Sequence, residues 1–214
     1  MEKLRQKIAL STLKKGEKAM TLELRGVDFG SHVFNTAGAR NFFGYSEIGG
    51  DWRQQGLFNL LSGHDWDGTT SISKTITLGH RAGNMPWRPD LQSEEYFPQC
   101  IYVDWRKSIV LNDVSLSNPG AVALLNLNVW QNFLEPFVIS FMSAAEMPED
   151  RLKEIITFCG IIKRLRSRFK AKFGLEFNDS CPNAGHDPQS LIAEAARKLQ
   201  AARHILPDMP FFWK

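Results

Sequence analysis

Cysteine is scarce in this sequence, which has only 3 in 214 residues, namely Cys100, Cys159 and Cys181. Their odd number and wide spacing do not fit a disulfide framework and favour a reducing compartment, so we expect a cytoplasmic protein. Long hydrophobic runs are also lacking. No segment approaches the ~20 apolar residues of a membrane span, and Met1–Glu17 lacks the apolar core of a signal peptide. We therefore expect neither export nor a membrane anchor.

A strong excess of charge is missing as well. Lys and Arg number 26 and Asp and Glu 23, and the formal net charge of +3 gives little field to attract nucleic acid or a membrane surface. The densest basic run, residues 163–172, closes a predicted helix, where cations complement the helix dipole. Because no nucleic-acid motif accompanies the run, nucleic-acid binding is the weakest of three functional hypotheses.

Sequence patterns of several common sites are absent. The 5 histidines have no spacing that would join them at a metal, and no Cys-x-x-Cys pair occurs, so we predict no metal site. A phosphate-binding Walker loop, a Rossmann glycine pattern and a Gly-x-Ser-x-Gly turn are absent too. Candidate chemistry must therefore come from single polar residues near the ends of strands.

The sequence does contain enough apolar residues, 43% of the chain, for one packed domain. Major strands are predicted to begin at Val33, Thr69, Phe137, Gly174 and Pro210. Helical patterns lie between them, over residues 48–61, 122–129, 152–162 and 188–202. This alternation predicts the α/β class, with parallel strands joined by right-handed crossovers.

The details of this prediction concern the connections and the end of the chain. Residues 105–111 form a predicted minor strand, and Ser143 with Glu146 is typical of a capping box before a helix. A closed TIM-type (β/α) barrel has eight strands, of which this sequence holds about five, and it stops on the apolar strand Phe211–Trp213. We expect residues 1–214 to be the N-terminal portion of one such barrel, incomplete, with a short extension over residues 1–19.

Three residues could carry chemistry because of their place at strand ends. Cys181 follows a predicted strand at its carboxyl end, where barrel enzymes hold catalytic groups, and a thiol there can transfer a proton. The alternative is a small buried residue in a turn. Lys74 and Lys214 could offer an inward cation to an anionic ligand group, or could simply face solvent.

Other polar residues give weaker signals. Asn112, Asn118 and Gly120 could present amide groups to a ligand, and helix capping explains them equally well. His80 and Arg81 are candidate anion contacts in a long irregular segment, although a basic pair in a loop is more often solvated.

Four segments, taken in order along the chain, resemble the dihydroorotate dehydrogenase family. Asn35–Gly38 resembles the Asn-Ala-Ser-Gly of its first strand, and Ser73–Thr77 with Gly83–Pro86 resembles its Thr-Lys-Thr strand and Arg-x-Gly-Asn-x-x-Pro-Arg loop. Asn112–Gly120 is similar to its Asn-x-x-Gly-Leu-x-Asn-x-Gly segment. The most specific match is Glu176–Asn183, which resembles Glu-Leu-Asn-x-Ser-Cys-Pro-Asn.

The resemblance implies an FMN-dependent oxidoreductase of pyrimidine metabolism that oxidises dihydroorotate or a related dihydropyrimidine. It implies that Cys181 is the proton-transferring base, as in the soluble class and in dihydropyrimidine dehydrogenases. The residues that it assigns to the substrate are Lys74, Asn112, Leu116, Asn178 and Asn183. Those that it assigns to FMN are Ala37, Gly38, Lys74 and Lys214.

The sequence also departs from the family pattern. Ser115 stands where the family has glycine before leucine, and Ser140–Ser143 lacks the glycine of Ser-Ile-Ala-Gly. The later strands, with their glycine-rich phosphate site, are not in this sequence. The second hypothesis is therefore a truncated or degenerate half-barrel without catalysis of its own, which needs a C-terminal part or a partner. For the enzyme we expect a homo-oligomer or association with that C-terminal half.

Overall fold

A parallel sheet forms the centre of the structure, a computed structural model that describes residues 21–55, 66–104, 106–180 and 188–214. Its strands are β3 (Ser71–Ile72), β6 (Phe137–Phe141), β7 (Phe173–Phe177) and β8 (Phe211–Trp213). All neighbours are parallel and the spatial order β3-β6-β7-β8 follows the order along the chain. The predicted α/β class with parallel strands is therefore confirmed.

Single bridges extend this sheet at two places. Ile76 pairs in parallel with Phe141, so the chain beyond β3 continues alongside β6. Phe34 pairs in parallel with Thr70, which places the predicted first strand next to β3 as a bridge rather than as a full strand. The parallel arrangement thus runs in chain order from Phe34 to Trp213.

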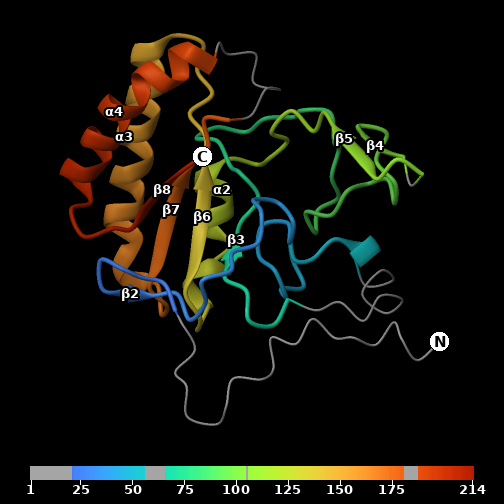
Figure 1. The fold of residues 1–214 in the computed structure, drawn as a ribbon, viewed down its shortest axis with the longest axis horizontal. Coiled ribbons are helices and arrows are strands. Elements are labelled where there is room, and N and C mark those ends of the chain that lie inside the picture. The colour runs from blue at the N-terminus through green and yellow to red at the C-terminus, as the bar shows by residue number, and fades with distance from the viewer. Residues whose placement is uncertain (1–20, 56–65, 105, 181–187) are drawn as a thin grey trace.

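Helices connect the strands, as the alternating pattern predicts. Helix α2 (Ala121–Asn126) and the short 3-10 helix η1 (Trp130–Asn132) precede β6. Helix α3 (Pro148–Leu165), extended by η2 (Arg166–Arg168), joins β6 to β7, and α4 (Pro188–Ile205) joins β7 to β8. Helices α3 and α4 lie side by side along the sheet (Figure 1). Of the predicted helix over residues 48–61, residues 48–52 are not helical, residues 53–55 are helical, and residues 56–61 lie outside the described residues.

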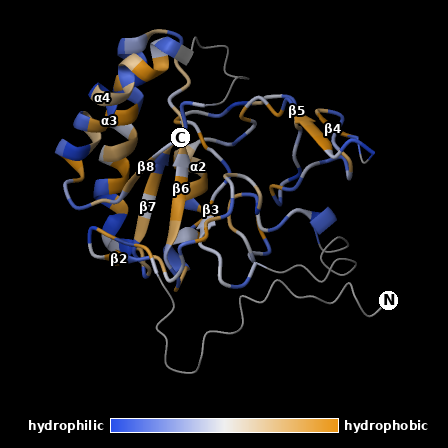
Figure 2. Ribbon diagram, in the orientation of Figure 1, coloured by the Kyte–Doolittle hydropathy of each residue, from blue (hydrophilic) through white to orange (hydrophobic). Residues whose placement is uncertain are grey.

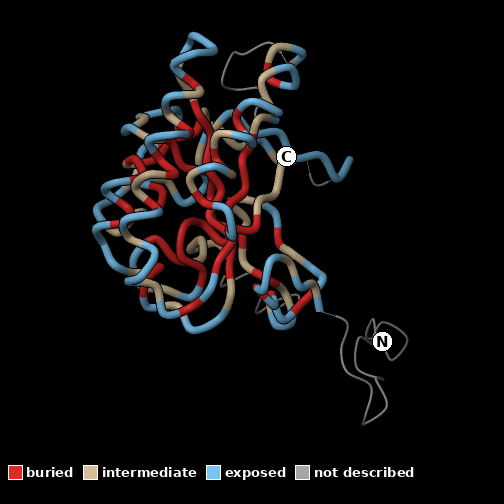
Figure 3. Tube along the Cα trace, turned by 90° about the vertical axis from the view of Figure 1, so that its left-hand side faces the viewer, coloured by how far each residue is buried: buried red, intermediate tan, exposed pale blue. Residues whose placement is uncertain are grey.

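The two faces of the sheet are buried in different ways because side chains alternate along each strand. Phe137, Ile139 and Phe141 of β6 pack in the larger core with residues of α2 and α3, such as Leu124 and Phe158. The intervening Val138 faces a smaller cluster that also holds Ile72, Phe212, Val27 and Phe29. Strands β6 and β7 are mainly hydrophobic (Figure 2), and the buried residues gather at the centre of the molecule (Figure 3).

Two hairpins stand outside the parallel sheet. Strands β1 (Glu23–Leu24) and β2 (Val27–Asp28) pair antiparallel, and Val27 packs in the smaller cluster with Ile72 and Val138. Strands β4 (Ile101–Asp104) and β5 (Ile109–Asn112) form a second antiparallel hairpin that projects away from the helices (Figure 1). The prediction of a minor strand over residues 105–111 was right for residues 109–111, which belong to β5, and wrong for residues 106–108, which form a turn. The Asp104 carboxylate accepts hydrogen bonds from the backbone of residues 106 and 107, and this turn separates β4 from β5.

The predicted capping box was also wrong. Helix α3 begins at Pro148, and its N-cap, Met147, has no side-chain cap. Proline at the first position needs no hydrogen-bond acceptor and already has a helical φ, so it starts the helix here. The carboxylate of Glu154 instead accepts hydrogen bonds from the backbone N–H groups of Ala144 and Ala145, at 2.7 and 3.1 Å.

Gly174 of β7 allows two rings to approach the strand. A Cβ at this position would lie 2.9 Å from Phe212 and 3.2 Å from Phe29. We expect Gly174→Ala to lower the free energy of unfolding by about 1–3 kcal/mol, because a well-packed core has no room for an added methyl group. Gly160→Ala in α3 is the matched control, since nothing lies within 4 Å of its Cβ position. There the helix should gain roughly 0.5–1 kcal/mol. Urea unfolding of both variants measures the contrast, and equal effects would contradict it.

Candidate active site

A cavity of about 420 Å³ lies at the carboxyl ends of the parallel strands. Thr75 follows β3, Asn178 and Ser180 follow β7, and Lys214 follows β8. Residues of the β4–β5 hairpin complete the lining from the other side. Open α/β sheets bind ligands outside the carboxyl ends of their strands, so this position is the one expected of an active site. The full lining consists of Ala37, Gly38, Trp52, Lys74, Thr75, Met85, Ile101, Val110, Asn112, Val114, Ser115, Leu116, Asn178, Ser180 and Lys214.

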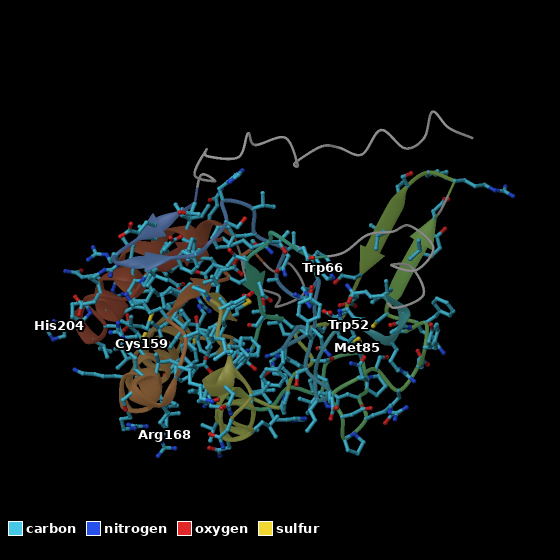
Figure 4. The ribbon with its side chains drawn as sticks, turned by 90° about the horizontal axis from the view of Figure 1, so that it is seen from below. Trp52, Trp66, Met85, Cys159, Arg168 and His204 are labelled. Carbon is cyan, nitrogen blue, oxygen red and sulfur yellow. The ribbon has the colours of Figure 1, made fainter. Side chains whose placement is uncertain are left out.

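The predicted site residues gather in this cavity. Every one of them that the structure describes is among the lining residues, namely Ala37, Gly38, Lys74, Asn112, Leu116, Asn178 and Lys214. Cys181 and Asn183 lie outside the described residues. Trp52 and Met85, which sequence reasoning did not single out, also line the cavity. They lie toward the β4–β5 hairpin, far from Cys159 among the helices (Figure 4).

The turn at Ala37 and Gly38 brings backbone into the cavity. Gly38 has a φ of 86°, a left-handed conformation that glycine adopts without steric cost. Its carbonyl oxygen accepts a hydrogen bond from Trp52 Nε1 at 2.8 Å. The N–H of Lys74 donates to Asn41 O at 2.7 Å, which holds the turn against the end of β3. A planar ligand could therefore lie directly against this backbone.

Lys74 is buried, with 8% of its surface exposed. Its ammonium group donates a hydrogen bond to Ser117 O and lies 5.0 Å from the centre of the Phe42 ring and 5.2 Å from that of Trp87. A carbonyl dipole and two aromatic faces thus stabilise the cation within the protein. Lys214 is exposed and continues β8 into the cavity. Both lysines line the cavity, and the ammonium group of Lys74 is already bound to Ser117 O.

The segment that precedes α2 has an unusual backbone. Ser115 and Leu116 both have a positive φ, 54° and 57°. Ser115 occupies the position where the resembling family has glycine, a residue that adopts this conformation without strain. The Ser115 hydroxyl donates to Asp113 Oδ1 at 2.6 Å and accepts from Asn84 Nδ2 at 3.2 Å. These hydrogen bonds stabilise the left-handed conformation of Ser115, which a side chain normally disfavours. The turn places Leu116 in the lining of the cavity.

Asn178 belongs to a buried chain of hydrogen bonds. Its Nδ2 donates to Thr75 Oγ1 at 2.9 Å, and the Thr75 hydroxyl lies 2.9 Å from Ser140 Oγ. Ser140 donates in turn to Glu176 Oε1 at 2.7 Å. Sequence reasoning assigned no role to Thr75, Ser140 or Glu176. The available signal was the spacing of two between Glu176 in β7 and Asn178 directly after it, which places both side chains on the same side of the extended chain.

A second polar cluster joins Asp179, just after β7, to side chains of helices α3 and α4. The Lys198 ammonium group, 1% exposed, is 3.1 Å from both carboxylate oxygens of Asp179 and 3.3 Å from Glu194. Arg151 forms an ion pair with Glu194 and donates to the carbonyl oxygens of Ala145 and Glu146. The cluster therefore ties the loops after β6 and β7 to helices α3 and α4.

The carboxyl groups of this cluster have shifted pKa values. Burial raises the pKa of Asp179 above its ordinary value, and the charge of Lys198 opposes this shift only in part. The hydrogen bonds from Arg151 lower the pKa of Glu194 to about 2. The charged form of Asp179 is thus stabilised by Lys198, because burial has removed the water that would otherwise stabilise it.

Other candidate residues from the sequence have structural roles. Asn118 is fully buried, and its Oδ1 accepts hydrogen bonds from the N–H groups of Thr77 and Gly120, at 3.1 and 2.9 Å. Its Nδ2 donates to Thr77 Oγ1 and Leu116 O, both at 2.7 Å. The side chain therefore stabilises the turn before α2 and is not presented to a ligand. Arg81 pairs through its backbone with Asn118.

The described cysteines, Cys100 and Cys159, are free thiols. Burial raises the pKa of Cys159 to about 12, so this thiol is a packing residue of the core. The pKa of Cys100 is also raised, mainly by burial. Neither thiol is activated as a nucleophile or base.

A larger cavity of about 660 Å³ lies at the opposite, amino ends of the strands. Its walls include Thr69 and Ser71 around the start of β3 and Phe137 at the start of β6. Arg40 lines it but is occupied by Asp51, which accepts its hydrogen bonds at 2.8 and 2.7 Å. None of the predicted site residues that the structure describes lines this cavity.

Within the described ranges, no group of His, Cys, Asp and Glu side chains could hold a metal ion. No described helix is both long and apolar enough to span a bilayer. The sequence matches none of the protein-family models and none of the curated proteins with which it was compared.

Proposed function

We propose that this chain binds FMN and oxidises a dihydropyrimidine, dihydroorotate being the first substrate to test. The observation that carries the proposal is the meeting of Ala37, Lys74, Asn112, Asn178 and Lys214 in one cavity. They were selected by a resemblance in sequence alone, and they come from distant parts of the chain. Their convergence at the carboxyl ends of parallel strands supports a common ligand.

The cavity suits a flavin ring in its chemistry. The backbone at Gly38 allows close approach, and the apolar side chains of Met85, Val114 and Leu116 can cover a planar ring. Its volume of about 420 Å³ is in the range of ligand pockets. Lys74 and Lys214 could offset the negative charge that a flavin gains on reduction. When bound, FMN would supply the acceptor for the hydride that leaves the dihydropyrimidine.

The protein's own part in the reaction is to orient the substrate and accept a proton. Asn112, Asn178 and Asn183 would hold the carbonyl and N–H groups of the ring, for which amide side chains offer both acceptors and donors. The Cys181 thiol, ionised, would remove the proton from the ring carbon. The buried ion pair between Lys198 and Asp179 supports this assignment, because it anchors the residue two positions before Cys181.

The finer fold that accompanies this function is a TIM-type (β/α) barrel. Its support is the arc of parallel strands in chain order, with a helix between each pair from β6 onward and a cavity at the carboxyl ends. The free thiols Cys100 and Cys159 support a cytoplasmic location. The exposed apolar side chains Val110 and Leu111, 63% and 61% exposed, support association with a second copy.

Flavin titration tests the proposal. Adding the purified chain to FMN should shift the flavin absorbance and quench its fluorescence. Lys214→Met should weaken binding about 3–10-fold, since an ionic contact at a partly exposed site contributes roughly 1 kcal/mol. Lys163→Met, an exposed lysine of α3 that does not line the cavity, is the control and should bind as the wild type does. A flavin spectrum unchanged by excess protein would overturn the proposal and favour a half-barrel without catalysis of its own.

A further inference from the structure

The direction of the hydrogen bonds in the chain from Asn178 to Glu176 can be assigned. Ser140 has one hydroxyl hydrogen, and it is donated to Glu176 Oε1 at 2.7 Å. The contact of 2.9 Å between Ser140 Oγ and Thr75 Oγ1 must then use the hydrogen of Thr75. Thr75 can accept only from Asn178 Nδ2, which lies at 2.9 Å. Every donor in the chain therefore points toward Glu176.

The side-chain amide of Asn178 is held from its other end as well. Its Oδ1 accepts hydrogen bonds from the backbone N–H of Ser180 at 3.1 Å and from the Ser180 hydroxyl at 2.9 Å. Both contacts agree with Nδ2 facing Thr75. One hydrogen of Nδ2 is bound to Thr75, and the second is the group that Asn178 can offer to the cavity it lines.

The members of the chain are all shielded from solvent. Ser140 is fully buried, while Thr75, Glu176 and Asn178 are each 6% exposed. Water therefore cannot easily replace a missing partner, and a broken link leaves a buried polar group unsatisfied. The hydroxyl groups of Thr75 and Ser140 could each point either way along the chain, and the acceptor at its end selects one direction.

We propose that Glu176 is a positioning residue that fixes the amide of Asn178 so that the cavity presents an N–H donor and selects a ligand carbonyl oxygen. With an apolar residue at position 176, Ser140 would turn its hydrogen toward Thr75, and the Thr75 hydroxyl would no longer be held as an acceptor for Asn178 Nδ2. The amide would then be held only through its Oδ1 by Ser180, and the N–H donor that faces the cavity would lose its fixed direction. The ligand preference thus depends on a side chain that does not contact the ligand.

The inference rests on the proposed function only for the identity of the ligand, a pyrimidine carbonyl. Its test has one arm without ligand. In ¹⁵N-labelled protein the side-chain amide of Asn178 is identified by its loss in Asn178→Asp. In the wild type one of its two hydrogens should exchange slowly with solvent, because it is bound to Thr75. Glu176→Gln, which keeps an acceptor for Ser140, should preserve this signature, and Glu176→Leu should abolish it.

The second arm measures orotate binding by calorimetry. Glu176→Leu should weaken it about tenfold or more, the cost of a mismatched buried polar contact, whereas Glu176→Gln should stay within about threefold. Ser140→Ala, which breaks the chain at its centre, should resemble Glu176→Leu and serves if that variant does not fold. Loss of the slowly exchanging hydrogen or of orotate affinity in Glu176→Gln would overturn the inference. The negative charge of Glu176, rather than the direction of the hydrogen bonds, would then be what matters. If the wild type binds no orotate, the proposed function fails, and the amide arm still decides the inference.

Discussion

Replacement of Cys181 by alanine is expected to slow the reduction of bound FMN by dihydroorotate about 100-fold or more. A positioned general base contributes about 10²–10⁴ to a rate, and alanine cannot accept a proton. Binding of FMN itself should not change, since the residues proposed to hold the flavin are Ala37, Gly38, Lys74 and Lys214. Stopped-flow absorbance under anaerobic conditions measures the reduction directly.

The control for this variant is Cys100→Ala. Cys100 lies near the β4–β5 hairpin, and burial raises its pKa, so it is a poor base. Its replacement should leave the rate of flavin reduction within about twofold. If Cys100→Ala reduced FMN slowly and Cys181→Ala reduced it at the wild-type rate, the base would be Cys100, and the assignment to Cys181 would be contradicted.

Replacement of Lys198 by methionine should lower the free energy of unfolding by about 3–5 kcal/mol at neutral pH, the usual cost of removing one partner of a buried ion pair. Methionine fills much of the space of the lysine stem but leaves the Asp179 carboxylate, 7% exposed in its side chain, without its cation. Urea unfolding followed by circular dichroism gives the change.

The loss in Lys198→Met should depend on pH with a definite sign. The pKa of Asp179 is raised in the folded protein, so protonation favours the folded state. The stability penalty should therefore grow as the pH rises above the ordinary value of 3.8 and shrink as the pH falls toward it.

The neighbouring residue provides the control for this variant. Arg197 pairs with Glu149 at 2.9 Å, but the two side chains are 59% and 65% exposed. Arg197→Met should leave the urea midpoint close to that of the wild type, because an exposed ion pair is solvated in the unfolded chain as well. Comparable losses in Arg197→Met and Lys198→Met would show that burial of the cluster has no special effect.

The sequence predicts the regular part of this fold because local pattern and packing agree there. Strand β6 is an apolar run between turn residues and was placed at its true start, and the apolar face of α3 placed the middle of that helix correctly. The hairpin β4–β5 was missed because residues 105–111 look like one short strand, while the turn depends on a side-chain contact of Asp104. The start of α3 was misplaced because Pro148 outweighs the pattern of Ser143 and Glu146.

The site was predictable in its membership but not in its contacts. Carboxyl ends of parallel strands meet at one edge, so residues after β3, β7 and β8 had to come together once the α/β class was known. The surroundings of Lys74 could not be foreseen, because Phe42, Trp87 and Ser117 reach it from loops distant in sequence. The chain from Asn178 to Glu176 was hidden for a related reason, since it links three strands through residues that are individually ordinary.

The larger cavity at the amino ends of the strands provides an internal alternative for the ligand site. Amide chemical shifts recorded as FMN is added to the ¹⁵N-labelled chain distinguish the two positions. We predict that the shifts concentrate at Gly38, Thr75, Leu116 and Lys214, around the smaller cavity. Shifts confined to residues of the larger cavity, such as Tyr45, Thr69 and Leu134, or no shifts at all, would contradict the proposed flavin site.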